Sequence, residues 1–549
     1  MKKTISSFII LCCILSLAKI NAQTHQIKWS FDTKDASFGQ SAAGDIDHDG
    51  KLEIVFGCYR NDSCVYALNA ENGSLLWKYN THTSAEGCND VAPIIYDVDN
   101  DDSLEVIVPS SCNPKCFCFN GKTGAVKWQT NTRGSDSPPT IADIDNDGKP
   151  EILFGEFGGY VMCINGEDGS VAWEIPVDTN SWIQTAPTIV DVDGDGQLDF
   201  VVGTWNTDTI TYNKVYAYRG DTHSLLWSYP IGIGISNVMY HGTAVADLDH
   251  DGKPELVIGS YNDTLYCINA ENGTTNWKYK QPGGYYFGAP ATIADLNKDG
   301  WCEVVFVDWY MVGALSHNGA LLWHYDIPNY EQAFRGVALA DITNDDTLDV
   351  IFGTDGGNVI ALNGTDGSHL WSKNLRTDYG DSLFAFDNAP LVADFNNDDT
   401  LEVFIVGGHG EYPAFSNDFG RAYMISAGKG TGPDWLMFQR DIRRQSSFCM
   451  DSTQAVNEVN PSRGNAVSVF PNPFTDETNL QISLASKSKI IISLFDITGR
   501  KVAKLFSSTL EAGINTVKWN TCNHLPAGIY QCSIDISGEI INKKIVLIR

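Results

Sequence analysis

The chain has few basic side chains for its length. Its 549 residues include 37 Lys and Arg against 68 Asp and Glu, which leaves a formal net charge of −31. Nucleic acids and anionic membrane surfaces attract proteins through clustered positive charge. The composition therefore argues against both as partners, and it favours a cation instead.

Long hydrophobic runs are also scarce. The apolar stretch 8–17 follows Lys2 and Lys3 and precedes the small-residue end of residues 20–22, which predicts a secretory signal over residues 1–22. This stretch is too short to span a membrane. No other segment has 18 uninterrupted apolar residues. We therefore expect a mature chain without a transmembrane segment, secreted or held at the cell surface.

Familiar catalytic signatures are missing. The sequence has no G-x-S-x-G and no H-E-x-x-H motif, and its cysteines do not have the spacing of a zinc site. Acidic residues are too abundant for spacing to single out a catalytic pair. We expect the loop residues His241 and His409 to be solvated. The sequence assigns no catalytic residue.

The cysteines are expected to meet an oxidising environment after export, where they can pair. The signal contains Cys12 and Cys13 of the 14 cysteines. Candidate bonds are Cys58–Cys64, one pair among Cys88, Cys112 and Cys116, and Cys522–Cys532. Three others replace an alanine of the repeat described next and are predicted to be buried apolar side chains: Cys118, Cys163 and Cys267.

One acidic phrase recurs eight times, beginning at residues 45, 97, 143, 191, 247, 295, 341 and 394. The first copy reads DIDHDGKLE, and successive copies begin 46 to 56 residues apart. A small-residue run precedes each copy, and three short β-type runs follow it. This period suits one four-stranded blade. The repeat predicts an all-β protein with an eight-bladed β-propeller over residues 23–450; a seven-bladed ring is the alternative.

A second phrase ends most blades, as in ALNAENGSLLW at residues 67–77. Its Gly supplies the positive φ that a tight turn needs, and its Trp is a large apolar surface that can dock on the next blade. Trp29 precedes the first acidic phrase and is a candidate for completing the last blade. Trp435 competes for the same position.

The acidic phrase has the composition of a calcium loop. Ca²⁺ takes six to eight oxygen ligands, which positions one, three, five and nine of D-x-D-x-D-G-x-x-[DE] can supply. Gly at position six allows the sharp turn. Without a cation, carboxylates gathered in one turn repel one another. The alternative is a solvated acidic turn, because Asp and Gly are common turn residues.

The eight copies differ in completeness. Four have every element: Asp45, Asp47, Asp49 and Glu53; Asp143, Asp145, Asp147 and Glu151; Asp191, Asp193, Asp195 and Asp199; Asp247, Asp249, Asp251 and Glu255. A fifth keeps Asp97, Asp99, Asp101 and Glu105 but has Asp102 at position six. Two have Asn at position three: Asp295, Asn297, Asp299 and Glu303; Asp394, Asn396, Asp398 and Glu402. The copy at Asp341 has Thr343 and Asp346 and is the weakest candidate. We expect several structural Ca²⁺ ions.

The repeats resemble two propeller families. Residues 38–57 (FGQSAAGDIDHDGKLEIVFG) and 286–300 (YFGAPATIADLNKDG) are similar to the FG-GAP and VCBS type of calcium-binding blade. The blade-ending phrases resemble the tryptophan-docking repeats of quinoprotein propellers, which bind pyrroloquinoline quinone. This resemblance implies the architecture, whereas fold alone does not fix function.

The end of the chain differs from the rest. The repeat stops before a polar linker at residues 451–465. Residues 466–549 contain VFPNPF, LFDITGRKV, INTVKWN and LPAGIYQC in this order. The segment resembles the type A sorting domain of the type IX secretion system, which implies a small β-sandwich recognised by an outer-membrane translocon and export across both membranes. An ordinary β-sandwich binding module is the alternative.

The two faces of the predicted ring differ in character. Acidic loops and Gly turns should share one face, and the longer loops between blades should lie on the other together with the second hairpin of each blade. Those loops and hairpins carry Tyr59, Trp182, Trp205, Tyr240, Tyr285, Tyr286, Trp309, Tyr310, Tyr330, Phe334, Phe384 and Phe386. Irregular loops on a rigid scaffold commonly bind ligands. We expect a glycan or protein ligand there; packing of the blade edges is the alternative.

Three functional hypotheses remain open at this point. The first is a binding or adhesion protein, the second a polysaccharide-degrading enzyme and the third a quinoprotein oxidoreductase. Alcohol dehydrogenases of the quinoprotein family often carry a disulfide between adjacent cysteines over the cofactor. In this chain the adjacent pair lies in the signal, at Cys12 and Cys13, which counts against the third hypothesis.

Overall fold

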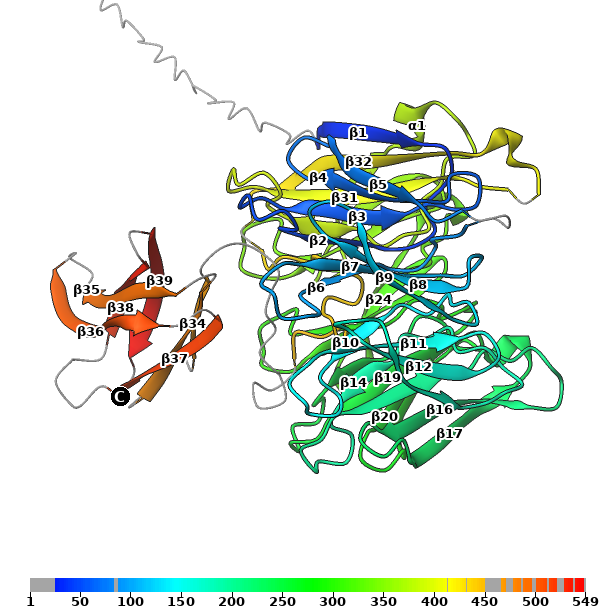
Figure 1. Cartoon of the computed structure of the whole chain (residues 1–549), viewed down its shortest axis with the longest axis horizontal. Coiled ribbons are helices and arrows are strands. Elements are labelled where there is room, and N and C mark those ends of the chain that lie inside the picture. Colours follow the sequence, from blue (N-terminus) through cyan, green and yellow to red (C-terminus); the bar gives the residue numbers. More distant parts are fainter. Residues whose placement is uncertain are drawn as a thin grey trace, which may run out of the picture.

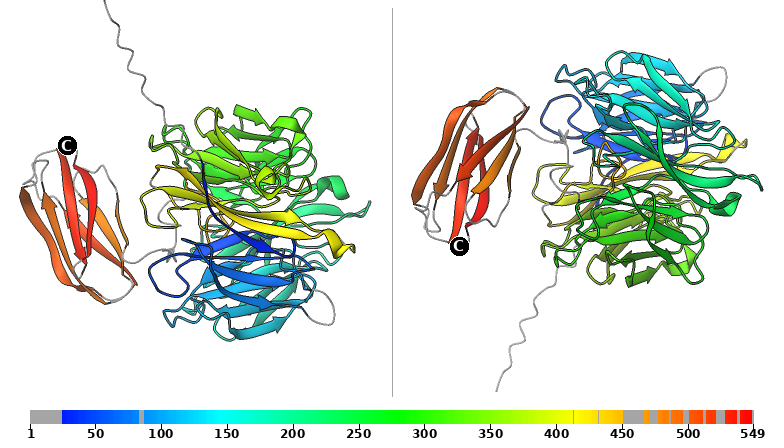
Figure 2. Two further views of the ribbon diagram at one scale, coloured as in Figure 1. Left: turned by 90° about the horizontal axis from the view of Figure 1, so that it is seen from above. Right: turned by 90° about the horizontal axis from the view of Figure 1, so that it is seen from below.

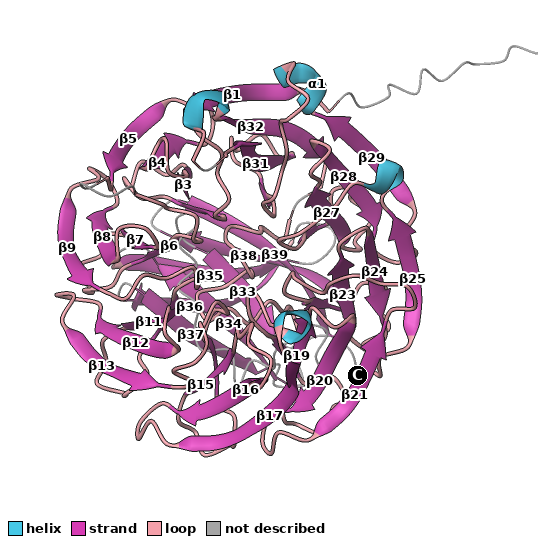
Figure 3. Ribbon diagram, turned by 90° about the vertical axis from the view of Figure 1, so that its right-hand side faces the viewer, coloured by secondary structure: helices cyan, strands magenta, loops and turns pink. Residues whose placement is uncertain are grey.

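The computed structural model describes residues 25–82, 87–411, 413–430 and 432–449, and the strands of the C-terminal domain between residues 466 and 547. The described residues before 450 form eight four-stranded sheets that surround a common axis as blades (Figure 3). The predicted all-β propeller is confirmed. The predicted signal, residues 1–22, and the linker, residues 451–465, lie outside the described residues.

Each blade has its first strand at the axis and its fourth at the rim. The first strands are β2 (Ser41–Gly44), β6 (Ile94–Tyr96), β10 (Thr140–Ala142), β14 (Thr188–Val190), β18 (Ala244–Ala246), β22 (Thr292–Ala294), β26 (Ala338–Ala340) and β30 (Leu391–Ala393). The second strands are β3 (Glu53–Gly57), β7 (Glu105–Ser110), β11 (Glu151–Glu156), β15 (Asp199–Gly203), β19 (Glu255–Ser260), β23 (Glu303–Asp308), β27 (Asp349–Gly353) and β31 (Leu401–His409).

The outer half of each blade is equally regular. The third strands are β4 (Cys64–Asn69), β8 (Lys115–Asn120), β12 (Tyr160–Asn165), β16 (Tyr212–Arg219), β20 (Thr264–Asn269), β24 (Met311–Leu315), β28 (Asn358–Asn363) and β32 (Phe419–Gly428). The rim strands are β5 (Leu75–Asn80), β9 (Val126–Asn131), β13 (Val171–Pro176), β17 (Leu225–Ile233), β21 (Thr275–Lys280), β25 (Leu321–Asp326), β29 (His369–Asn374) and β1 (Ile27–Thr33). Short helical turns occur in the loops: η1 (Ile235–Asn237), η2 (Pro328–Tyr330), α1 (Arg376–Tyr379) and η3 (Phe415–Asn417).

The two ends of the ring are joined within one blade. Strand β1 pairs antiparallel with β32, so the first strand of the chain completes the last blade (Figure 1). Trp29, on β1, takes the rim position for which Trp435 also competed. Its indole N–H donates to Ala70 O in the next blade at 2.7 Å.

The rim tryptophans fasten neighbouring blades together, as the sequence predicts. The indole N–H of Trp77 donates to Gly121 O at 2.5 Å, and that of Trp128 donates to Gly166 O at 2.8 Å. Gly124 has φ of +67°, and a Cβ there would lie 2.6 Å from the Trp77 ring. This turn glycine therefore serves both the backbone conformation and the close approach of the neighbouring Trp.

The axis of the propeller is filled by the chain itself, which the sequence did not predict. Residues 432–448, here called the axial segment, follow the last blade and accept hydrogen bonds from the first strands of several blades. Leu436 O accepts from Ala43 N at 2.7 Å, and Gln445 O accepts from Val245 N at 2.8 Å. Trp435 and Arg444 are both fully buried. The Arg444 guanidinium donates to Pro139 O at 2.9 Å, and burial lowers its pKa to about 9.

Two disulfide bonds form among the described cysteines, Cys88–Cys112 and Cys302–Cys449. The first is one of the pairs predicted. The second ties the end of the axial segment to an acidic loop 147 residues earlier, a distance that hides the pairing from sequence inspection. The candidate bond Cys58–Cys64 is wrong, because both thiols are free and Cys64 donates to Asp62 O at 3.3 Å.

Of the remaining cysteine predictions, those for three buried side chains are confirmed and the one for the Cys522–Cys532 bond is not tested. Cys118, Cys163 and Cys267 are free and buried, as expected for small apolar side chains. Cys532 is also free and buried. Its candidate partner Cys522 lies outside the described residues.

The C-terminal domain is a β-sandwich, as predicted (Figure 2). One sheet contains β33 (Ala466–Phe470), β34 (Glu477–Leu484) and β37 (Gly513–Asn520), and the other contains β36 (Lys501–Leu510), β35 (Ser488–Phe495), β38 (Gly528–Ile536) and β39 (Glu539–Leu547). Side chains of both sheets form one core, among them Leu480, Trp519, Ile492 and Ile534.

Candidate functional site

The eight acidic loops connect the first and second strands of the blades and share one backbone geometry. The carboxylate of position one accepts the N–H of position six, for example Asp45 Oδ2 from Gly50 N at 3.0 Å. Position six has positive φ in every loop, +86° at Gly50 and +65° at Asp102. Asp102, Asp346 and Asp399, which replace the expected Gly, therefore adopt the same left-handed conformation.

The ninth residue of each loop is a buried carboxylate at the start of the second strand. One of its oxygens accepts the N–H of position two, as in Glu53 Oε2 with Ile46 N at 3.0 Å and Glu255 Oε2 with Leu248 N at 2.8 Å. Glu53 Oε1 and Asp199 Oδ1 are shielded from solvent and accept no hydrogen bond. Buried acceptors without a partner are costly, so these loops have room for a further ligand.

Burial also raises the pKa of these carboxyl groups. The pKa reaches about 8 for Glu53 and Glu255, because burial and the neighbouring aspartates both disfavour the charged form. It reaches about 7 for Glu151 and about 6 for Asp199, for the same reasons. A bound cation would relieve both effects.

Five loops bring three carboxylates within ligand distance of one another. In each, one oxygen per residue lies within 4.8 Å of the others: Asp45, Asp47 and Glu53; Asp97, Asp99 and Asp101; Asp143, Asp145 and Glu151; Asp191, Asp193 and Asp199; Asp247, Asp249 and Asp251. All four complete loops are in this group. Oxygen-rich clusters of this kind suit Ca²⁺.

In the other three loops the side chain at position three donates to the buried carboxylate, although Asp349 Oδ1 still accepts no hydrogen bond. Asn297 Nδ2 donates to Glu303 Oε1 at 3.1 Å, and Asn396 Nδ2 donates to Glu402 Oε1 at 3.0 Å. Thr343 donates its hydroxyl to Asp349 Oδ2 at 3.1 Å. Since the side chain at position three acts as a donor here, these loops offer a cation fewer oxygens.

Basic side chains enter three of the loops. Lys127 Nζ lies 2.6 Å from Asp99 Oδ2 and 2.9 Å from Glu105 Oε1. Arg219 forms ion pairs with Asp193 and Asp195. Lys28 Nζ lies 3.6 Å from both Asp398 Oδ2 and Glu402 Oε1. These loops therefore carry a positive charge supplied by the chain.

The complete loops at Asp45, Asp143 and Asp247 are arranged otherwise. The lysine at position seven of each turns toward a glutamate of the adjacent Gly turn: Lys51 to Glu71 at 3.0 Å, Lys149 to Glu167, and Lys253 to Glu271 at 3.4 Å. These contacts also show that acidic loops and Gly turns share one face, as predicted.

The opposite face has the aromatic loops, but only some of their rings are accessible. Trp182, Tyr285 and Tyr330 have exposed fractions of 46%, 52% and 88%. Phe384 and Phe386 are buried in the core, so they cannot contact a ligand. The expectation that His241 is solvated is wrong, because it is buried and its Nδ1 lies 2.8 Å from Gly288 O.

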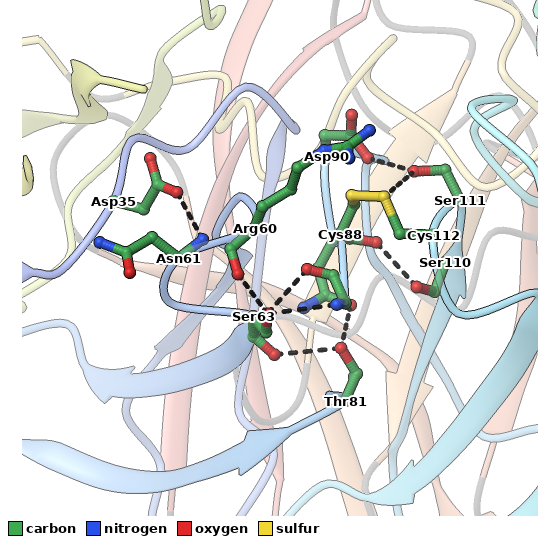
Figure 4. Close-up of a disulfide and its surroundings, with 12 residues drawn as sticks. Asp35, Arg60, Asn61, Ser63, Thr81, Cys88, Asp90, Ser110, Ser111 and Cys112 are labelled. Atoms are coloured by element: carbon green, nitrogen blue, oxygen red, sulfur yellow. Dashed lines mark hydrogen bonds between the residues drawn. A yellow bond between two sulfur atoms is a disulfide. The ribbon is translucent and has the colours of Figure 1, made fainter. Parts of the chain in front are cut away.

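A cavity of about 530 Å³ opens on this face. Its lining residues all lie in loops or hairpins of the first four blades: Tyr59, Arg60, Cys88, Asp90, Ser111, Cys112, Asp136, Phe157 and Trp182. Figure 4 shows the Cys88–Cys112 disulfide, which joins two of these lining residues, with Arg60 extending toward Asp90. We call this feature the loop-face cavity.

Sequence reasoning found only part of this cavity. Tyr59 and Trp182 were among the predicted aromatics, whereas Asp136, Ser111 and Phe157 carried no motif. Asp90 and Asp136 come from successive between-blade loops 46 residues apart. Only the ring geometry brings them together, since the blade repeat places equivalent loops side by side.

Comparison with protein families identifies two parts of the chain. Residues 143–202, 191–258 and 247–306 match the FG-GAP-like repeat, and residues 468–548 match the secretion system C-terminal sorting domain. The resemblances to FG-GAP repeats and to the sorting domain are thereby confirmed. The chain is a β-propeller with FG-GAP-like repeats, and its type IX sorting domain directs export to the cell surface or the extracellular space.

One relative matches part of the chain by sequence. Tetrathionate hydrolase of Acidithiobacillus ferrooxidans is 26% identical over 198 residues, which are 33% of this chain and 37% of that protein. The match thus spans little more than a third of that relative's length.

Two solved structures are similar in fold. The quinohemoprotein alcohol dehydrogenase from Comamonas testosteroni has a TM-score of 0.51 at 12% identity, covering 74% of this chain and 77% of its own. Sqt1 from Saccharomyces cerevisiae has the same score and identity, covering 74% of this chain and 99% of its own. At this identity both show the propeller fold alone.

Within the described parts of the chain, no helix has the length and apolar character needed to cross a bilayer.

Proposed function

We propose that this chain is an exported β-propeller, braced by calcium, that binds an extracellular glycan or protein on the face opposite its acidic loops. The observation that carries the binding role is the loop-face cavity, a concave site of about 530 Å³ formed by loops on a rigid ring. Small-ligand sites are typically concave and about 300–1,000 Å³ in volume.

The calcium part of the proposal is supported by the loops at Asp45, Asp143, Asp191 and Asp247. Each gathers three carboxylates, and Glu53 Oε1, Asp143 Oδ1 and Asp199 Oδ1 are buried oxygens without a hydrogen-bond partner. In these loops the carboxylates of positions one, three, five and nine would hold the ion. Its positive charge would neutralise the cluster and fix the turn between the first two strands.

Loops that contain a basic side chain of the chain itself need the ion less under this proposal. Lys127 and Lys28 supply a positive charge to the loops at Asp97 and Asp394. Arg219 does so for the loop at Asp191, but it contacts Asp193 and Asp195 and leaves Asp199 Oδ1 without a partner. We therefore rank the loops at Asp45, Asp143 and Asp247 as the strongest sites.

A binding experiment tests the recognition role. The full chain, kept in Ca²⁺, is applied to an array of glycans and to a panel of purified extracellular proteins. Saturable binding that is lost when the loop-face aromatics Trp182 and Tyr285 are changed to Ala supports the proposal. Binding that depends instead on the acidic-loop face contradicts it.

A second candidate, a polysaccharide-degrading enzyme, is favoured by one observation. Ser111 Oγ donates to Asp90 Oδ1 at 2.9 Å and also interacts with Asp136, so the two carboxyl groups are neighbours. Burial and the Asp90 charge raise the pKa of Asp136 to about 7. Carboxyl pairs with separated pKa values carry out acid–base chemistry on glycosides. Release of reducing ends from a bound polysaccharide, abolished by Asp136→Asn, would establish this activity.

A further inference from the structure

One wall of the loop-face cavity is aromatic. The rings of Phe157 and Trp182 lie 4.9 Å apart between centroids, at an angle of 47°. Tyr59 also lines the cavity, and it packs edge-on against Phe38 at 5.1 Å. The indole of Trp182 is 46% exposed, although large aromatic side chains usually bury most of their surface. The wall therefore presents an uncovered apolar surface to whatever enters the cavity.

Polar groups in the cavity lining and next to it are only partly satisfied: Asp136 lines the cavity, whereas its neighbours Gln184 and Arg335 do not. Gln184 Nε2 donates to Asp136 Oδ2 at 3.2 Å. Asp136 Oδ1 and Gln184 Oε1 are shielded from solvent and accept no hydrogen bond, and Arg335 Nε is a shielded donor without an acceptor. Buried groups of this kind call for a partner. Asp136 Oδ1 thus calls for a ligand that donates hydrogen bonds.

The charges around the cavity balance one another. Asp90 and Asp136 disfavour an anionic ligand, as does the net charge of −31. Arg60 lines the cavity and Arg335 lies close enough to Asp136 to influence its pKa, so both disfavour a cationic ligand. The site is therefore suited to a neutral, strongly polar molecule.

The shape of the site distinguishes a sugar from a peptide. Peptides commonly add a strand to an open sheet edge or lie along a groove, but every residue that lines the cavity lies outside the strands. A sugar ring has an apolar C–H face and an edge of hydroxyl groups, each of which donates and accepts. Its face matches the Trp182 wall, and its hydroxyl edge matches Asp90 and Asp136.

We propose that the loop-face cavity binds a neutral saccharide, stacked on Trp182 and Phe157 and hydrogen-bonded by Asp90 and Asp136. This inference rests on the proposed function and names its ligand class. The Cys88–Cys112 disulfide joins two other lining residues and so holds the loop of Asp90 and the hairpin of Ser111 together before the ligand arrives, which reduces the entropy lost on binding.

The test uses the full chain in Ca²⁺ and an array of short oligosaccharides built from glucose, galactose, mannose, xylose or N-acetylglucosamine. Uronic-acid oligosaccharides and neutral, acidic and basic peptides complete the array. Oligosaccharides that bind are then titrated calorimetrically against the parent chain and the variants Trp182→Ala and Asp136→Asn. The matched control is Tyr330→Ala, which removes an aromatic ring of the same face that is 88% exposed and lies outside the cavity.

We expect a neutral oligosaccharide to bind the parent chain and Tyr330→Ala equally. The affinity should fall about tenfold or more in both cavity variants, the scale of loss at a central contact. Melting curves establish that the variants are folded; Trp182 is half exposed and Asn is isosteric with Asp, so neither change should disturb the core.

Three results would overturn the inference. Neutral-saccharide binding that survives both cavity variants places the ligand outside the cavity and overturns the inference; the proposed function then stands only if Tyr285→Ala abolishes the binding. Binding confined to peptides or uronic acids also refutes the saccharide assignment but keeps a binding role. Absence of binding to every probe contradicts both the inference and the proposed function.

Discussion

At the scale of single residues, the acidic loops differ in where their positive charge comes from. All eight share the position-six turn and the buried carboxylate at position nine. Lys127 enters the loop at Asp97 and contacts Glu105 at 2.9 Å, whereas Lys51 lies 3.0 Å from Glu71 and 4.0 Å from Asp49 Oδ2 at the edge of the loop at Asp45. Under the calcium proposal, the same backbone would rely mainly on a lysine in one blade and on an ion in another.

The variant Glu53→Gln tests the ion-dependent loop. In Ca²⁺ it should lower the free energy of unfolding by about 1–3 kcal/mol, because a charged ligand is lost. In EDTA the loss should shrink or reverse, because an uncompensated buried carboxylate is removed. Chemical unfolding in both conditions measures the difference. Glu105→Gln is the control, and its cost in unfolding free energy should be the same with and without Ca²⁺, since Lys127 is its partner. Equal behaviour of the two variants would refute the division into ion-dependent and lysine-dependent loops.

The variant Lys127→Met tests the lysine-dependent loop. Removing the ammonium leaves Asp99, Asp101 and Glu105 without a positive charge, so the loop should acquire a requirement for Ca²⁺. Equilibrium dialysis should then find more bound Ca²⁺ per chain than in the parent. Lys253→Met, which removes a lysine paired with Glu271 of the Gly turn, should leave the bound amount unchanged. An unchanged amount for Lys127→Met would contradict the role given to this lysine.

At the scale of elements, each blade depends on its acidic loop and on the Trp of its rim strand. The loop fixes the hairpin between the first and second strands. The Trp docks on the turn of the next blade, as Trp77 does with Gly121 O at 2.5 Å. Stability within a blade and adhesion between blades are therefore separate contributions that can be measured independently.

The loops predict a particular pH dependence. The pKa of Glu53 rises from its usual 4.5 to about 8 in the folded chain without a cation. Because the folded state then binds protons that the unfolded state releases, the free energy of unfolding in EDTA should fall as pH rises from about 4.5 to about 8. Bound Ca²⁺ stabilises the ionised form, so the slope should flatten. Unfolding curves across this pH window check the effect; equal slopes in EDTA and Ca²⁺ would contradict it.

The rim contact can be tested with Trp77→Ala. This side chain is 7% exposed, and its loss should cost about 3–5 kcal/mol, the usual range for deleting a buried aromatic side chain. Trp182→Ala removes a ring that is half exposed and should cost much less. Denaturant unfolding of both variants in Ca²⁺ compares them. Similar losses would show that the rim contacts do not hold the blades together.

Much of the blade could be predicted from the sequence, because the period of the repeat and the turn chemistry are local. The acidic phrase located every first hairpin, and the Gly–Trp phrase located most of the rim strands. Sequence reasoning failed where contacts are distant in the chain. The Cys302–Cys449 bond, the axial segment and the pairing of Asp90 with Asp136 all depend on ring closure, which no local pattern encodes.

At the scale of the whole molecule, the ring is closed twice. Strand β1 completes the last blade, and the axial segment joins the first strands of several blades before the Cys302–Cys449 bond anchors its end. The sorting domain follows as a separate sandwich with its own core. Folding of the propeller and export of the chain are thus assigned to different parts of the sequence.

Removal of residues 466–549 should separate these roles. The truncated chain should fold and keep its Ca²⁺-dependent melting, because the sandwich has its own core, but it should accumulate between the inner and outer membranes. Cell fractionation of a bacterium with a type IX system measures its location, with the full chain as control. Normal appearance of the truncated chain outside the cell would refute the sorting role.

The claim on which the account depends is that cations brace the acidic loops. Thermal unfolding of the full chain in Ca²⁺, in EDTA, and in EDTA followed by excess Ca²⁺ or Mg²⁺ tests it most directly. We predict a clearly lower midpoint in EDTA that Ca²⁺ restores. Mg²⁺ should restore it poorly, because it requires octahedral geometry and gives up water reluctantly. The same midpoint in all four conditions would contradict the account.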